Sequence, residues 1–275
     1  MSLFLSWIGI GLFPTRESDT PPARYWERPQ RLLMSFAFTG AAYPIISSSV
    51  LFRLQSAIPV LGTGIPRYSS VFDALIRRPR WHLWRGSGVL LGVQVIARVL
   101  HNLLVDRLRS FGAPVSLCQP LVGVLLTATL TPLRTVQILL LADISAGYSG
   151  PRGVARCLHR IRGVRGFASG LFSASAAVLV HEAVRSVVGD AVRRSRVGGR
   201  YNATLSRVVS VVSAGLFAYV LDGIALYRMA RALPTTSQGW RPEATLTIIR
   251  QGELMQGVVT GVLLNTIVGM IHSHI

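Results

Sequence analysis

Long apolar stretches alternate with short polar, arginine-rich ones along nearly the whole chain. The apolar stretches cover residues 31–54, 86–105, 112–143, 170–192, 203–231 and 257–271. A helix needs about 20 residues to cross the hydrocarbon core of a membrane, so each stretch can form one span. Proline or glycine inside three of them is compatible with a membrane helix whose neighbours satisfy the freed carbonyls. The pattern predicts an all-α membrane protein with six transmembrane helices and no sizeable soluble domain.

Two sets of positions recur along the chain with nearly constant spacing. Steps of 88 residues join the first set, which consists of Pro44, Pro132 and Val220. Steps of 84 and 87 join the second set, which consists of Gly86, Gly170 and Gly257. Two sets in phase indicate one unit of about 90 residues used three times. We expect three helical hairpins, over about 31–110, 111–200 and 201–275, with short amphipathic helices near 69–79, 152–161 and 243–250.

Residues 1–30 do not follow this repeat. Their first 13 residues are apolar but too short to span, and a polar, proline-rich stretch follows. Neither a basic start nor a small-residue cleavage site for a secretory signal is present. We therefore interpret 1–30 as an N-terminal extension, apolar and then proline-rich, and 31–275 as one six-helix domain.

The charge of the chain is strongly positive, and all of its basic residues are arginine. The net charge is +18, although only 15% of the residues are charged and 50% are hydrophobic. Because the arginines lie between the apolar stretches and not on a separable basic domain, they favour an anionic membrane surface over nucleic acid as a partner. Arginine bias from codon composition is an equally plain explanation.

The titratable residues form no pattern that is typical of an enzyme. The six histidines form no metal-ligand set, and the chain has no paired carboxylates, nucleophile elbow or phosphate loop. We therefore predict no catalytic residue, no metal site and no cofactor.

Glycines at the expected helix starts predict sites for an anionic lipid. A helix N-terminus offers unpaired N–H groups and a partial positive charge, and glycine lets a phosphate approach the backbone. Cardiolipin is the expected lipid. The candidate residues are Trp84, Arg85, Gly86, Gly150, Arg152 and Gly170.

The three hairpins, each with an aromatic–basic–glycine start to its second helix, resemble the mitochondrial carrier family over about residues 31–275. Repeat one reads "YSSVFDAL…RPRWHLWRG", repeat two "YSGPRGVARCLHRIRGVRGFASG" and repeat three "RQGELMQG". Ala168 and Ser169 replace the aromatic and basic residues in the second, and Met255 and Gln256 in the third. The resemblance implies six tilted helices with pseudo-threefold symmetry in the mitochondrial inner membrane.

In that family the first helix of each repeat ends in proline-x-acid-x-x-base, and these charges pair between repeats to close the matrix side. Here most of those charges are lost, and the corresponding positions hold Ile46, Ser49, Arg134, Gln137 and Ala225. Only Asp222 is of the implied kind, so the resemblance implies no specific closure at that end. On the opposite side it implies gate-like pairs at Asp106 with Arg109 and at Asp190 with Arg193; ordinary helix-surface pairing is the alternative.

The family binds its solute near the membrane midplane, about seven residues into the second helix of each repeat. Here those positions hold Val93, Ala177 with Val178, and Leu264, which cannot replace the hydration of a charged solute. Polar residues nearby are candidates for lining a cavity, although Glu182 and Arg185 could simply neutralise each other. These candidates are Gln94, Arg98, His181, Glu182, Arg185 and Asn265.

The missing charges lead to the functional hypothesis. We expect a divergent, carrier-like inner-membrane protein that has lost transport and acts as an accessory subunit of a larger respiratory or ATP-synthase-type assembly, in contact with cardiolipin. One alternative is an active carrier for a small solute. The other is a lipid-handling or protein-insertion factor built on the same fold.

Overall fold

A computed structural model of the chain describes residues 29–54, 68–112, 115–143, 148–195, 202–232 and 262. Within these ranges the chain is all helical and has no strand. Four of the described segments are long and apolar enough to cross a membrane: Arg80–Ser110, Cys118–Ala142, Val164–Ser195 and Val208–Ala230. The expected class, a helical membrane protein, is confirmed at this level.

Five long helices coincide with five of the six predicted apolar stretches. They are α2 (Pro29–Leu54), α5 (Ser87–Ser110), α6 (Val115–Ala142), α9 (Leu171–Ser195) and α10 (Asn202–Ala230). α2 begins at Pro29, two residues before the predicted boundary, where proline is well tolerated because a first-turn N–H has no helical partner. The sixth predicted stretch, 257–271, lies outside the described residues, apart from residue 262.

α2 forms a helix as predicted. Its last three turns carry Ser47, Ser48, Ser49 and Arg53. All four of these side chains are buried inside the protein. In the described part of the chain, four of the six predicted spans are matched by candidate spans and a fifth by the long helix α2.

Short helices precede α5 and α9 in the same order. α3 (Val71–Arg77) and α4 (Arg80–Leu83) lead into α5, whereas α7 (Pro151–Arg162) and α8 (Val164–Phe167) lead into α9. α3 and α7 match the amphipathic helices predicted near 69–79 and 152–161. The third such helix, predicted near 243–250, lies outside the described residues, as does most of the N-terminal extension.

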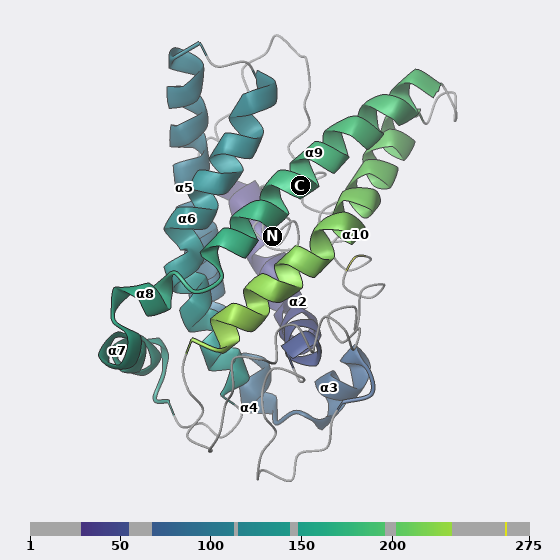
Figure 1. The fold of residues 1–275 in the computed structure, drawn as a ribbon. Helices are drawn as coiled ribbons and strands as arrows, with labels where there is room; N and C mark the ends of the chain where they lie inside the picture. The colour runs from purple at the N-terminus through teal and green to yellow at the C-terminus, as the bar shows by residue number, and fades with distance from the viewer. Residues whose placement is uncertain are drawn as a thin grey trace.

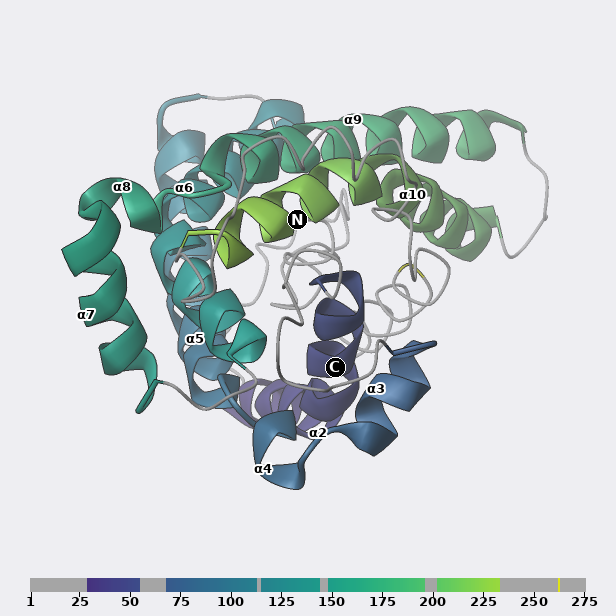
Figure 2. The ribbon, with the colours of Figure 1, turned by 60° about the horizontal axis from the view of Figure 1, so that its bottom comes forward.

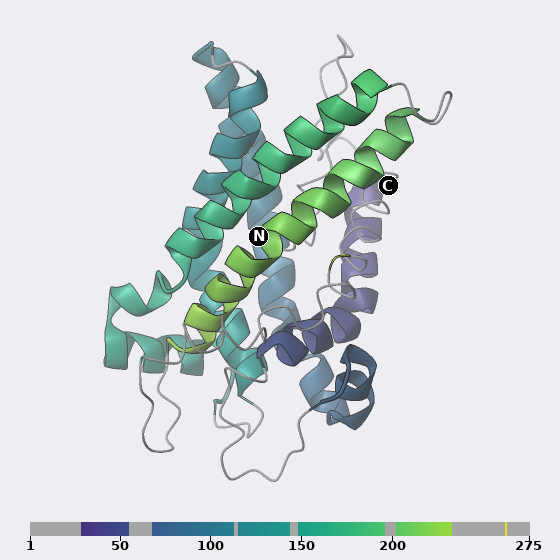
Figure 3. The same cartoon turned by 45° about the vertical axis from the view of Figure 1, so that its right-hand side comes forward.

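The long helices stand in an arc in which α6 is the best-connected member. α5 lies beside α6, and α9 lies beside α10 along most of its length, as Figures 1 and 3 show. α6 also contacts α9, α10 and α2, and α2 contacts α5 and α10 (Figure 2). An apolar core fills the space between them; its members include Ile46, Leu90, Leu126, Ala177 and Leu226.

Two of the recurring glycines start helices where another segment comes very close. Gly86 is the N-cap of α5 with φ 85°, and Gly170 precedes α9 with φ 79°. A Cβ atom on Gly86 would lie 2.9 Å from Tyr43 Oη, and one on Gly170 would lie 2.6 Å from the carbonyl oxygen of Ala225. Both positions therefore require glycine for its left-handed backbone and for its lack of a side chain.

A matching pair of hydrogen bonds joins the long helices to the short ones. Ser47 Oγ lies 3.1 Å from the carbonyl oxygen of Leu83, and Thr135 Oγ1 lies 3.3 Å from that of Phe167. Each hydroxyl shares its proton with a carbonyl oxygen of its own helix, Pro44 at 3.0 Å and Thr131 at 2.9 Å. Each hydroxyl lies three residues after a recurring proline, Pro44 or Pro132, and Leu83 and Phe167 each end the short helix before a recurring glycine. The first two sequence repeats thus make the same contact.

Candidate functional site

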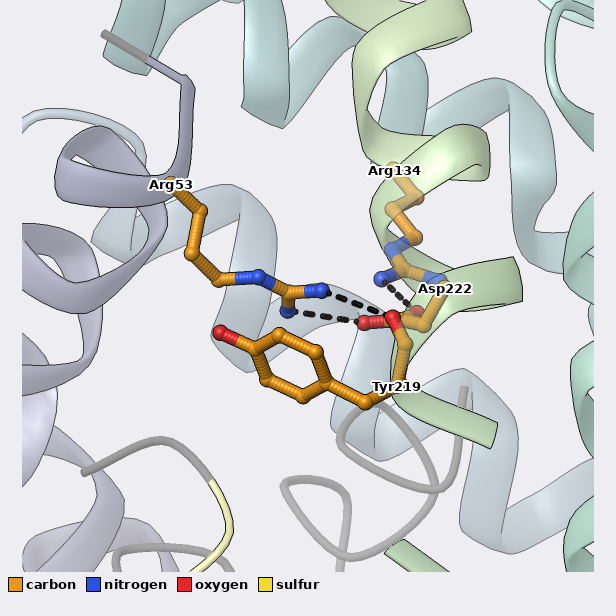
Figure 4. A network of polar contacts seen from close by, with 4 residues as sticks. All are labelled: Arg53, Arg134, Tyr219 and Asp222. Atoms are coloured by element: carbon orange, nitrogen blue, oxygen red, sulfur yellow. Dashed lines mark hydrogen bonds and ion pairs between the residues drawn. The ribbon is translucent and has the colours of Figure 1, made fainter. Parts of the chain in front are cut away.

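The most concentrated group of charges inside the protein joins α2, α6 and α10. Asp222 of α10 is fully buried, and its two carboxylate oxygens accept hydrogen bonds from different helices. Arg53 Nη1 of α2 donates to Oδ2 at 3.0 Å, and Arg134 Nη2 of α6 donates to Oδ1 at 3.1 Å. We call Arg53, Arg134, Tyr219 and Asp222 the Asp222 network (Figure 4).

Tyr219, one helical turn before Asp222, holds Arg53 in two further ways. Arg53 Nη2 donates to the Tyr219 carbonyl oxygen at 3.2 Å, and the guanidinium lies 4.0 Å from the centre of the Tyr219 ring. The planar guanidinium of arginine can bond in its plane and stack on its face at once. Figure 4 shows Arg53 reaching across from α2 to both residues of α10.

The Asp222 network corrects the expectation that no specific charge pairs join the helices at this end. Arg134 stands where an acid was expected, yet it pairs with Asp222, which lies 88 residues later at the equivalent position. Ile46, Ser49, Gln137 and Ala225, the other positions without the expected charge, are buried in the packing between helices. The network has two cations and one anion, so its net charge is positive.

Sequence reasoning did not find Arg53. It lies four residues after Ser49, the expected basic position, and therefore one turn further along the same helix face. The only signal in the sequence is an arginine in the last turn of an otherwise apolar and hydroxyl-rich helix. Its partner is 169 residues away, beyond the range of any local pattern.

A second buried arginine ties the loop between α3 and α4 to α2. Arg78 donates to Ser47 Oγ at 3.1 Å, to Ser48 Oγ at 3.3 Å and to the His82 carbonyl oxygen at 2.9 Å. Burial lowers the pKa of the Arg78 guanidinium to about 10. It therefore still carries its charge at neutral pH and acts as a structural cross-link.

The structure gives Arg85, a predicted lipid-binding residue, a protein partner instead. Arg85 Nη2 lies 2.5 Å from Asp143 Oδ2 and 2.8 Å from the Tyr148 carbonyl oxygen. Its side chain is 11% exposed, and Asp143 balances its charge. Trp84 remains half exposed. Close packing between helices already accounts for glycine at positions 86 and 170. Of the predicted lipid sites, the start of α7 is therefore the one without such an explanation.

That candidate is Gly150 with Arg152. Gly150 has φ 133° and no atom within 4 Å of a Cβ position, and Arg152 is exposed. The start of α7 therefore has open space beside Gly150, which lets a small anionic group approach the helix end.

The two predicted gate-like pairs on the opposite side behave as surface residues. Arg193 Nη2 bonds Asp190 Oδ1 of its own helix at 2.7 Å, and both side chains are about half exposed, at 56% and 50%. Asp106 and Arg109 are exposed on α5, and no ion pair joins them in the described part of the chain. The helix-surface alternative fits Asp190 and Arg193, and neither pair joins two of the described helices.

The candidate cavity residues mostly bond neighbouring helices or each other. Gln94 Nε2 of α5 donates to Thr39 Oγ1 of α2 at 2.8 Å. Arg185 of α9 bonds Gln119 of α6 at 2.5 Å and forms an ion pair with Glu182 at 2.7 Å, as the neutralising alternative predicted. His181 Nδ1 lies 3.3 Å from Glu182 Oε1. Asn265 lies outside the described residues.

Arg98 and the midplane positions complete this region. The Arg98 guanidinium lies 5.7 Å from the centre of the Phe36 ring, and the residue is 6% exposed. Val93, Ala177 and Val178 are fully buried in the apolar core, whereas Leu264 lies outside the described residues. Among the described residues, no group of three or more histidine, cysteine or acidic residues could hold a metal ion.

Compared with known proteins, the chain matches no family model and no curated protein sequence. Its functional assignment therefore rests on the residues and contacts described above.

Proposed function

We propose that the chain is a carrier-like protein of the mitochondrial inner membrane that has lost transport and serves as an accessory subunit of a larger respiratory or ATP-synthase-type assembly. The observation that carries this proposal is how the polar side chains of the spans are used. Gln94 and Arg185 bond neighbouring helices, and the described midplane positions, Val93, Ala177 and Val178, are apolar and fully buried.

The proposal includes six spans in three repeats. It is supported by the order of short and long helices, which is the same before α5 and α9, and by the equivalent bonds of Ser47 and Thr135. α10 supplies the first long helix of the third repeat, with Asp222 at the position equivalent to Arg134.

Alternating access requires two closed arrangements of similar free energy. Releasing the Asp222 network would leave a buried carboxylate and two buried arginines without their ion pairs. Opening at this end therefore requires water or other polar groups to replace these partners, because a buried charge without a partner is costly. Nearer the opposite side, Arg185 of α9 bonds Gln119 in the first turns of α6. Polar contacts between helices thus hold the bundle toward both ends, as suits a static subunit.

An active carrier is the second candidate, and the Asp222 network itself favours it. The network joins the first long helix of each proposed repeat at one end of the bundle, where a carrier would need a closure. This alternative predicts that the network opens during turnover.

The proposal also includes anionic lipid, most specifically cardiolipin, bound at Gly150 and Arg152. Lipid mass spectrometry of the purified protein should show cardiolipin enriched over the bulk membrane, and a Gly150→Val variant should lose this enrichment. Equal cardiolipin content in the two proteins would contradict a site at this helix start.

The accessory role is tested by isolating the tagged chain from mitochondria in a mild detergent and separating the native complexes by size. We expect the 29.9 kDa chain to migrate with a much larger complex, in constant ratio to its subunits. Migration as a free monomer, under conditions that keep the respiratory complexes and ATP synthase intact, would contradict the role and favour the carrier.

A further inference from the structure

α7 exposes a row of arginines on the side that faces away from the protein. Arg152, Arg156 and Arg160 recur every four residues and are all exposed, which places them along one helix face. Val154 and Leu158 are buried on the opposite face, where they pack with residues of α6. We call Arg152, Arg156 and Arg160 the basic face of α7.

The charges of the basic face are not used within the described part of the protein. α7 has no acidic residue in its sequence. The described aspartates and glutamate that form ion pairs do so elsewhere, for example Asp73 with Arg77 and Asp143 with Arg85. No hydrogen bond or ion pair involves the side chains of the basic face in the described ranges. Three cations on one helix are thus available to an external anion.

The position of α7 indicates which anion this is. α7 ends at Arg162, and a candidate membrane span begins at Val164. Figure 1 views α7 nearly end-on while α5 and α6 run up the picture, and Figure 2 shows α7 on the outside of the bundle. α7 therefore lies across the direction of the spans, at the level where one of them begins.

Apolar side chains are exposed beside the arginines at that level. Ile161 is 49% exposed and Val164 is 76% exposed. A helix with basic residues and nearby exposed apolar residues is typical of the membrane–water interface, where the apolar groups enter the boundary and the cations meet the headgroups.

We propose that the basic face of α7 binds the headgroups of anionic phospholipids at the membrane surface. Each arginine close to an anionic surface strengthens binding by about fivefold, and the attraction acts within about 10 Å at moderate salt. The inference rests only on α9 being a membrane span, and it holds whether or not the chain transports a solute. It shares Arg152 with the lipid proposed at Gly150 but adds Arg156 and Arg160, whereas that lipid would use backbone amides of the first turn.

The test places a fluorescent probe next to the basic face in the full-length chain. Val164→Cys is labelled in a Cys157→Ser background, where Cys118 is buried and protected from the reagent. The protein is reconstituted in phosphatidylcholine vesicles that contain a minor fraction of phosphatidylglycerol, and brominated forms of either lipid serve as quenchers. We expect brominated phosphatidylglycerol to quench several-fold more strongly than its mole fraction predicts, and high salt to remove the excess.

Three variants make the result specific. Arg156→Gln with Arg160→Gln should abolish the excess quenching by phosphatidylglycerol, whereas Arg156→Lys with Arg160→Lys should keep it. Arg107→Gln with Arg194→Gln removes two exposed arginines near the far ends of α5 and α9 and should leave the excess unchanged. Equal quenching by the two lipids in the unaltered chain, or an excess that survives the double glutamine substitution, would overturn the proposal. Absence of quenching by either lipid would also overturn it and would point to an acidic protein partner.

Discussion

Asp222 is shared by two arginines that come from two other helices, and its carboxylate is their common acceptor. Burying a charge is costly unless it is paired and hydrogen-bonded. The network meets this condition because each carboxylate oxygen receives its own guanidinium. Loss of the Asp222 carboxylate would therefore leave two buried cations unpaired, whereas loss of one arginine would still leave Asp222 with the other.

Replacing Asp222 with asparagine should destabilise the folded protein strongly, because it leaves Arg53 and Arg134 buried without an anion. We expect a loss of about 3–5 kcal/mol, measured as a lower midpoint of thermal unfolding in detergent. Asp190→Asn removes an acid of the same kind from a half-exposed ion pair and should cost about 1 kcal/mol at most. Adding Arg134→Gln to Asp222→Asn should recover part of the loss; strictly additive effects would show that the two residues do not interact.

A comparison of Gly170 with Gly112 distinguishes two reasons for glycine at a position: a positive φ angle and a lack of space for a Cβ atom. Both have positive φ, at 79° and 74°, but only Gly170 has a neighbouring backbone oxygen at the place of a Cβ atom. Gly170→Ala should therefore lower the free energy of unfolding more than Gly112→Ala does, by about 1–3 kcal/mol. The difference is measured from the thermal unfolding of the two variants. Similar losses for both variants would mean that α9 can move away from α10 at little cost.

At the scale of elements, hydroxyl groups of the long helices bond the carbonyls that end the short helices. Thr135→Val keeps the shape of the side chain but removes a hydroxyl that is shared between the Thr131 carbonyl oxygen at 2.9 Å and the Phe167 carbonyl oxygen at 3.3 Å. We expect its loss to lower the free energy of unfolding, measured by thermal unfolding, by at most about 1 kcal/mol. Thr129→Val is the matched control on α6, since Thr129 is exposed and bonds only Leu125 of its own helix. A larger effect at Thr129 than at Thr135 would contradict this role for the hydroxyl.

The sequence predicted these elements well because their signals are local. The apolar stretches coincided with α2, α5, α6, α9 and α10 within a few residues, and Gly86 and Gly170 did start helices. The serines in the last turns of α2 and Arg53 are buried inside the protein, which the apolar pattern alone did not indicate.

The contacts between elements were harder to predict. Replacement of an expected acid by Arg134 suggested a lost pair, whereas the arginine has a partner on another helix. Arg85 belongs to a motif that suggests lipid binding, yet it forms an ion pair with Asp143, 58 residues away. In both cases the partner depends on how distant segments pack, which a local pattern does not contain. The pair of Glu182 with Arg185 was foreseen as an alternative because it lies within one turn of a helix.

At the scale of the whole molecule, the polar contacts inside the bundle link helices that an alternating carrier would have to move apart. Gln94 joins α5 to α2, Arg185 joins α9 to α6, and the Asp222 network joins α2, α6 and α10. The core between these contacts is apolar and closely packed, and such interiors resist continuous deformation. The central claim is that the bundle is a static scaffold in the membrane.

The most direct test is solute exchange by the purified chain in liposomes loaded with nucleotides, phosphate, di- and tricarboxylates or basic amino acids. The account predicts uptake no higher than in protein-free liposomes for every one of these solutes. Saturable exchange of any of them, lost in Arg98→Gln or Arg185→Gln variants that still fold, would contradict the static scaffold and establish a working carrier.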